Sequence, residues 1–193
     1  MRFLGTWAPA MWLTLAGGSC GALGIAAAVT GRPSLACALL VLAGLADLFD
    51  GPVARRLHRD LRSEQIGGQL DSLADTISFL ALPVALTAAL APGWPVAAAL
   101  AYVPAGLMRL AVFNLEHVPG RRTHYRGVPV TYAALVIPVV ALIAPAALPL
   151  ALLALAVGFV LDVPVRKPRG AAYLMLGAVA IVVLTLLALR GVR

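Results

Sequence analysis

Four aspartates stand in two pairs beside long apolar runs in the first half of the chain. Asp47 and Asp50 occur in "DLFDGPVAR", directly after "SLACALLVLAGLA". Asp71 and Asp75 occur in "DSLAD", at the head of the next apolar run. On a helix, spacings of three and four residues each place a pair on one face. Because four carboxylates that face one another repel strongly, the pattern predicts that cations lie between them.

The ligand type and the neighbouring residues indicate which cation and which substrate such a site would take. Carboxylate oxygens suit hard cations, so we expect one or two ions of Mg²⁺ or Mn²⁺, which commonly hold substrate phosphates as well. Arg55, just over one helical turn beyond Asp50, adds a fixed positive charge suited to phosphate. The small residues Gly51, Ala54 and Gly67 fall on or beside the acidic faces, where a ligand could approach the backbone.

Ion pairing and cation transport account for the aspartates less well than a metal site does. Ion pairs with arginines of the 55–62 segment would account for one or two acids, but not for four on matching faces. A cation-coupled transporter is the competing functional class, because ionisable residues at membrane depth are functional by default. Transporters usually carry such acids near the middle of the membrane on broken helices. Acids at helix ends on one side favour an enzyme.

The elements that must position these acids are membrane helices. The chain has 193 residues, 62% of them hydrophobic and 12% charged, which is more apolar surface than a soluble domain of this length can bury. We expect an all-α polytopic bundle that forms one integral membrane domain over residues 1–193, with a retained first helix rather than a cleaved signal peptide. Seven helices are predicted, at residues 7–29, 34–50, 72–91, 94–114, 128–144, 147–163 and 171–189. The Pro145–Pro149 break leaves open whether 128–163 is two helices or one kinked helix.

Basic residues predict the orientation. With a cytoplasmic amino terminus, every Lys and Arg falls in an inner segment except Arg32, Arg190 and Arg193, as the positive-inside rule requires. Both acidic pairs then lie at cytoplasmic helix ends, joined by a loop of about fifteen residues. The same asymmetry explains the net charge of +7 without nucleic acid as a partner, and the basic inner face would lie against anionic lipid headgroups. Gly17 and Gly21, at GxxxG spacing, are expected to allow close helix packing.

The acidic segments resemble the signature of the CDP-alcohol phosphatidyltransferases, D-x2-D-G-x2-A-R-x8-G-x3-D-x3-D. Its fixed residues are matched by Asp47, Asp50, Gly51, Ala54, Arg55, Gly67, Asp71 and Asp75. One departure is that "RLHRDLRSEQI", between Arg55 and Gly67, has three residues more than the signature, and we expect these to lengthen the cytoplasmic loop. The resemblance covers residues 8 to 169 and implies a six-helix core, to which a seventh helix at about 171–189 is added.

Further segments are similar to one branch of that family, the phosphatidylserine synthases. They are "GGQLDSLADTISF", "MRLAVFN" with Arg109, "RGVPVT", and "LTLAGGSCG" with Thr14. The resemblance implies that Thr14, Gly51, Ala54, Arg55, Gly67 and Arg109 contact the substrates. Arg109 would bind a carboxylate or phosphate, although an ordinary positive anchor at the membrane surface is an equal alternative.

The resemblance also implies an activity in phospholipid biosynthesis. Asp47, Asp50, Asp71 and Asp75 would hold the metals, and Asp75 would be the catalytic base. The enzyme would transfer the phosphatidyl group of CDP-diacylglycerol to the hydroxyl of L-serine and release CMP. Glycerol 3-phosphate or inositol phosphate as acceptor is the alternative, which the cluster Arg121, Arg122 and Arg126 would serve. A homodimer in a bacterial or archaeal plasma membrane, with the active site at the cytoplasmic face, completes the expectation.

Overall fold

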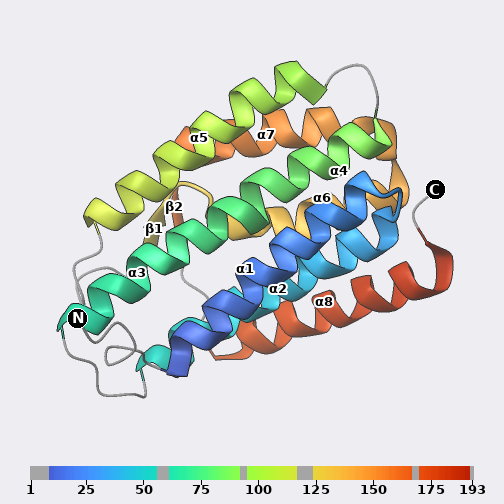
Figure 1. Cartoon of the computed structure of the whole chain (residues 1–193). Helices are drawn as coiled ribbons and strands as arrows, with labels where there is room; N and C mark the ends of the chain where they lie inside the picture. Colours follow the sequence, from blue (N-terminus) through green and yellow to red (C-terminus); the bar gives the residue numbers. More distant parts are fainter. Residues whose placement is uncertain (1–8, 56–60, 92–94, 117–123, 167–169, 192–193) are drawn as a thin grey trace.

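The structure is a computed structural model that describes residues 9–55, 61–91, 95–116, 124–166 and 170–191. Within these ranges the chain is a bundle of helices with one short two-stranded ribbon at one end (Figure 1). The α-helices are α1 (Pro9–Val29), α2 (Pro33–Arg55), α3 (Leu61–Asp75), α4 (Leu82–Leu90), α5 (Pro95–Glu116), α6 (Ala133–Ile143), α7 (Leu148–Val160) and α8 (Ala171–Arg190). The ribbon pairs β1 (His124–Arg126) with β2 (Pro164–Arg166) in antiparallel fashion.

A π-helical turn joins α3 to α4, so that Leu61–Leu90 is a single helical segment. This turn, η2, spans Thr76–Ala81. Counting the joined segment once gives seven helical segments in the described residues, which confirms the predicted all-α bundle. Five of the segments are long and apolar enough to cross a membrane: α1, α2, α3 to α4, α5 and α8. The α6 and α7 segments are apolar but shorter. The chain is therefore an integral membrane protein by length and composition of its helices.

The segment 128–163, which the sequence leaves open, is two helices. The α6 helix ends at Ile143 and α7 begins at Leu148, with a 3₁₀ turn over Pro145–Ala147 between them. Proline lacks a backbone N–H and fixes its φ angle, so it suits a turn followed by the first residues of a new helix.

The prediction that a cytoplasmic loop of about fifteen residues joins the acidic pairs is wrong. The α2 helix continues to Arg55 and α3 begins at Leu61, so most of the segment between the acidic pairs is helical. The apolar pattern does not reveal this extension because "LRSEQIGGQL" is polar and carries no run of hydrophobic residues. Of the residues between Arg55 and Gly67, those at 61–66 lie in the first turns of α3, and those at 56–60 lie outside the described residues, as does the predicted lengthening of the loop there.

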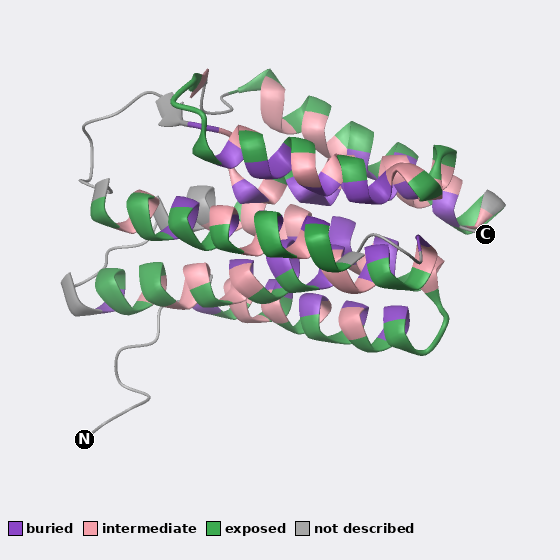
Figure 2. Ribbon diagram, turned by 90° about the horizontal axis from the view of Figure 1, so that it is seen from above, coloured by how far each residue is buried: buried purple, intermediate pink, exposed green. Residues whose placement is uncertain are grey.

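Close packing of α1 against α2 and α3 forms the part of the bundle that carries the acids (Figure 1). A Cβ added at Gly17 would lie 3.3 Å from the Cβ of Ala46 on α2, and one added at Gly18 would lie 3.2 Å from the Cβ of Ala74 on α3. Buried residues gather on the faces that the helices turn toward one another, and exposed residues cover their outer faces (Figure 2). Exposed leucines and valines on those outer faces fit contact with lipid.

Both acidic pairs lie toward the same end of the bundle. The carboxyl end of α2, the amino end of α3, the carboxyl end of α5 and the β1–β2 ribbon are all at this end (Figure 1). The turn at Thr30–Arg32 and the Pro145–Ala147 turn lie at the other end. The helices therefore bring all four aspartates of the signature to one end of the bundle.

Candidate active site

Three carboxylates from two helices meet in the structure. Asp47 comes from α2, and Asp71 and Asp75 come from successive turns of α3. Each offers a carboxylate oxygen, and these three oxygens all lie within 4.8 Å of one another. Asp47 and Asp71 are half-buried and Asp75 is buried. Like charges this close, with little access to water, are stable only with protons or a cation between them.

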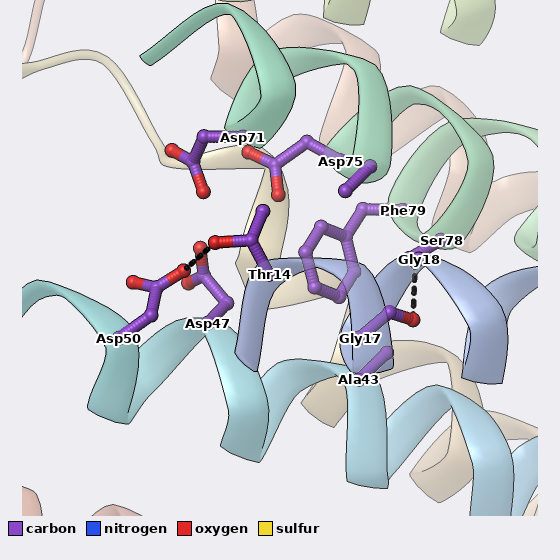
Figure 3. A pocket seen from close by; sticks show the side chains of 11 residues that line it. Thr14, Gly17, Gly18, Ala43, Asp47, Asp50, Asp71, Asp75, Ser78 and Phe79 are labelled. Atoms are coloured by element: carbon purple, nitrogen blue, oxygen red, sulfur yellow. Dashed lines mark hydrogen bonds between the residues drawn. The ribbon is translucent and has the colours of Figure 1, made fainter. Parts of the chain in front are cut away.

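The fourth acid, Asp50, faces the same cavity and is held by a residue of the first helix. The Thr14 hydroxyl on α1 donates a hydrogen bond to Oδ2 of Asp50 at 3.1 Å (Figure 3). Both residues lie with the other three acids in the lining of one cavity of about 200 Å³, which includes space open to solvent. Three helices therefore contribute polar side chains to a single hollow.

The remaining lining of the cavity consists of small residues, one hydroxyl and one ring. It is formed by Gly17, Gly18, Ala43, Ala74, Ser78 and Phe79. Because these side chains are mostly small, the backbone of α1 approaches α2 and α3 closely beside the acids. Ser78 is buried and its hydroxyl donates to the carbonyl of Gly17 at 3.1 Å (Figure 3). This bond ties the segment that follows Asp75 directly to α1.

The structure describes the positions of only some of the predicted substrate-contact residues. The backbone of α2 remains helical through Gly51, Ala54 and Arg55, but their side chains lie outside the described residues. Gly67 is half-buried on α3, one helical turn before Asp71. Thr14 lies in the cavity, as described above.

Arg109 lies apart from the residues that line this cavity. It is buried on α5, and its Nε donates to the carbonyl of Val128 at 3.3 Å. Its Nη2 donates to the carbonyl of Gly127 at 3.5 Å. Gly127 has a φ of 81°, a conformation that favours glycine. These contacts hold the chain where the β1–β2 ribbon leads into α6.

Several residues of the cavity are not among the site residues that the sequence predicts. Gly17 packs against Ala46 as its GxxxG spacing predicts, but it also lines the cavity together with Gly18. Ser78 and Phe79 line the cavity as well. A signal for both is present in the sequence, because Ser78 lies three residues after Asp75 and Phe79 four residues after it, so a helix places them near the same face.

The acidic cluster fits a divalent cation. Oxygen ligands of Mg²⁺ lie roughly 2.0–2.1 Å from the ion, so two ligands of one ion are at most about 4.2 Å apart. The three carboxylate oxygens lie within 4.8 Å of one another, which is near this limit, and the donor set contains only the hard oxygen atoms that such ions prefer. The cavity is lined by all four carboxylates, which suit cations and the phosphates that such cations hold.

The fold and the cavity together define an all-helical membrane protein with a carboxylate cluster suited to metal and phosphate at one end of its bundle. The sequence pattern of the family described as CDP-alcohol phosphatidyltransferase matches residues 7–189, and the chain belongs to this family.

Curated relatives match part of the chain. An archaetidylserine synthase of Methanothermobacter thermautotrophicus is 34% identical over 128 residues, which cover 65% of this chain and 54% of that protein. A CDP-diacylglycerol–serine O-phosphatidyltransferase of Mycobacterium tuberculosis is 34% identical over 97 residues, or 49% of this chain and 33% of that protein. The protein of the same name from Bacillus subtilis is 33% identical over 91 residues, or 45% of this chain and 49% of that protein. The chain thus matches about half, or less, of the length of each relative.

Proposed function

We propose that this chain transfers the phosphatidyl group of CDP-diacylglycerol to the hydroxyl of L-serine, giving phosphatidylserine and CMP. The observation that carries the proposal is the cluster of Asp47, Asp71 and Asp75, whose oxygens lie within 4.8 Å of one another on residues that match the family signature. Serine is favoured as the acceptor because the names of all three relatives specify serine.

The acids have two roles in the proposed reaction. Asp47, Asp50 and Asp71 hold Mg²⁺ or Mn²⁺, and the family resemblance implies two ions. When bound, these ions neutralise the diphosphate and stabilise the departing CMP. Thr14 orients the Asp50 carboxylate toward the cavity through its hydrogen bond. The small side chains of Gly17 and Gly18 leave room for phosphate oxygens beside α1.

Asp75 completes the site as the general base, and it also helps to hold an ion. The serine hydroxyl oxygen forms a bond to the phosphorus that carries diacylglycerol, while the bond from that phosphorus to the CMP oxygen breaks. The carboxylate of Asp75 takes the hydroxyl proton. A general base typically contributes about 10²–10⁴-fold to the rate, provided that it lies within hydrogen-bond reach of the proton. The place of Asp75 in the lining of the cavity suits that task.

The substrate contacts of the resemblance are part of the proposal. Gly51, Ala54, Arg55 and Gly67 would line the path of the cytidine diphosphate at the end of α2 and the start of α3. Arg109 already donates to the carbonyls of the 127–128 segment through its Nε and Nη2, at a place apart from the residues that line the acidic cavity. We therefore assign Arg109 first to holding that segment.

The position in the membrane follows from the same proposal. The acids lie at the end of the bundle where α2 ends and α3 begins, and the arginine-rich segments adjoin this end in the sequence. By the positive-inside rule this end faces the cytoplasm, where water-soluble serine and CMP can exchange while the acyl chains stay in lipid. A homodimer is proposed from the family resemblance alone.

An acceptor panel tests the proposal. Purified protein in detergent with CDP-diacylglycerol and Mn²⁺ or Mg²⁺ would receive serine, glycerol 3-phosphate or inositol phosphate, and CMP release would be measured. We expect release with serine. Release only with a phosphorylated polyol would show that serine is not the acceptor, while the same phosphatidyl transfer would still hold. No release with any of the three acceptors would refute the transferase proposal.

A further inference from the structure

The π-helical turn η2 lies directly after Asp75 and separates the acidic part of the helix from α4. Within it, the backbone N–H of Leu82 donates to the carbonyl of Ile77, five residues earlier, instead of the usual four. Turns of this kind are rare and occur frequently at functional sites. Neighbouring residues explain both why the π-helical turn forms here and what it does to the packing of the helix.

Pro83 is the cause that the sequence supplies. In an α-helix, residue 83 would donate its N–H to the carbonyl of Phe79, but proline has no N–H and its ring crowds the carbonyl four residues before it. Pro83 and Phe79 are both buried in the core of the bundle. A buried carbonyl that lacks its helical donor needs another partner, because an unsatisfied one is costly.

Tyr102 of α5 provides a donor. It is fully buried, and its hydroxyl donates to the carbonyl of Phe79 at 2.6 Å. Its ring packs against Phe159 of α7, with 5.4 Å between the ring centroids. The bond therefore connects α5 and α7 to the wide turn that begins one residue after Asp75.

The wide turn keeps the acidic helix in register with α1. A Cβ added at Gly18 would meet Ala74, one added at Gly21 would meet Ser78, and one added at Gly24 would meet Leu82. On the long helix these contacts recur every four residues, whereas an α-helix has 3.6 residues per turn, so each such step would rotate the contact face by about 40°. The π turn takes up this drift.

We propose that Tyr102 is a positioning residue of the metal site. Through Phe79, whose ring lines the acidic cavity, it stabilises the turn that sets the rotation of Asp71 and Asp75 toward Asp47 (Figure 3). The assignment of these acids as ligands rests on the proposed function. The inference adds a residue outside the cavity that controls their geometry.

Binding of Mn²⁺ to the purified chain, measured by electron paramagnetic resonance without substrate, tests the inference. The variant is Tyr102→Phe, which removes the hydroxyl and keeps the ring that packs on Phe159. The control is Thr87→Val on α4. Thr87 is also fully buried, and it donates to the carbonyl of Pro83 at 2.8 Å, away from the acids.

We expect Tyr102→Phe to raise the Mn²⁺ dissociation constant by about tenfold, as when a group that orients metal ligands is lost. Thr87→Val should change it by less than about twofold, since its bond does not reach the acidic turn. Unchanged Mn²⁺ affinity in Tyr102→Phe would overturn the inference, even if its melting temperature fell. If Tyr102→Phe does not fold, Pro83→Ala replaces it, because a restored N–H would close the π turn; unchanged affinity there would also overturn the inference.

The same experiment separates this inference from the proposed function. Wild-type protein that binds Mn²⁺ but releases no CMP with any acceptor would refute the function and leave the Tyr102 comparison valid. Wild-type protein that releases CMP while Tyr102→Phe binds Mn²⁺ normally would refute the inference alone. Wild-type protein that binds no Mn²⁺ would refute both, because each requires a metal ion held by these acids.

Discussion

Gly21 tests how far the site depends on close approach of α1 to the acidic helix. It is buried one turn beyond Gly17, and a Cβ added there would lie 2.8 Å from the Cα of Ser78, with the Ser78 hydroxyl closer still. A Cα cannot rotate away as a side chain can. The Gly21→Ala variant must therefore separate the two helices or displace the turn that carries Ser78.

The size of the effect follows from this contact. Ordinary contact begins at 3.4 Å, so the backbone must yield by 3.4 minus 2.8, or 0.6 Å. Overpacking of this kind costs about 1–3 kcal/mol, and strain on the Ser78–Gly17 hydrogen bond adds about 0.5–1.5 kcal/mol. The higher helix propensity of alanine offsets about 1 kcal/mol. The net loss of unfolding free energy is then about 0.5–3.5 kcal/mol.

A matched pair of variants provides the assay. Gly177→Ala on α8 makes the same chemical change where no atom lies within 4 Å of the added Cβ. Reversible unfolding in mixed micelles would give the free energies, and CMP release with CDP-diacylglycerol and serine would give the activities. Gly21→Ala should also lose activity on the order of tenfold, because small displacements of reacting groups are costly. Equal stability and activity in the two variants would refute the dependence of the site on this close helix contact.

Three further substitutions address single side chains. Asp75→Asn should lower the rate of CMP release by about 10²-fold or more and leave binding of a CDP-alcohol analogue nearly unchanged; normal turnover would contradict the general-base assignment. Thr14→Val removes the 3.1 Å bond to Asp50 and should raise the Mn²⁺ concentration for half-maximal activity by about fivefold, with thermal stability as the control. Arg109→Lys loses the planar group that reaches two carbonyls and should lower the melting temperature while the KM for serine stays within about twofold; a large rise in KM at unchanged stability would instead place Arg109 on the acceptor.

The bundle and the acidic faces are predictable from the sequence for a physical reason. Apolar runs of membrane length are strong signals of membrane helices. On such helices, the three- and four-residue spacings of the aspartates place each pair on one face. Hence Asp47, Asp71 and Asp75 lie together as their spacing indicates. The start of α3 at Leu61 is not predictable in this way, because this polar helical stretch has no apolar period.

Contacts between segments that are distant in the chain cannot be predicted from the sequence alone. Pro83 is visible in the third apolar window, but a proline there is equally consistent with a kink or a helix end. Its effect as a π turn depends on Tyr102, which is 23 positions away from Phe79 and on another helix. The packing of Ser78 against Gly21 depends in the same way on how α1 and the acidic helix approach one another.

Metal-dependent product formation is the most direct test of the central claim that the four aspartates form the metal site of a phosphatidyltransferase. Chelator-treated protein would receive CDP-diacylglycerol and serine, and CMP and phosphatidylserine would be quantified as Mn²⁺ is added back, in parallel with Asp71→Asn. We predict equal amounts of the two products, appearing only with the metal and lost in Asp71→Asn. Equal product formation without the metal, or in Asp71→Asn, would contradict the claim.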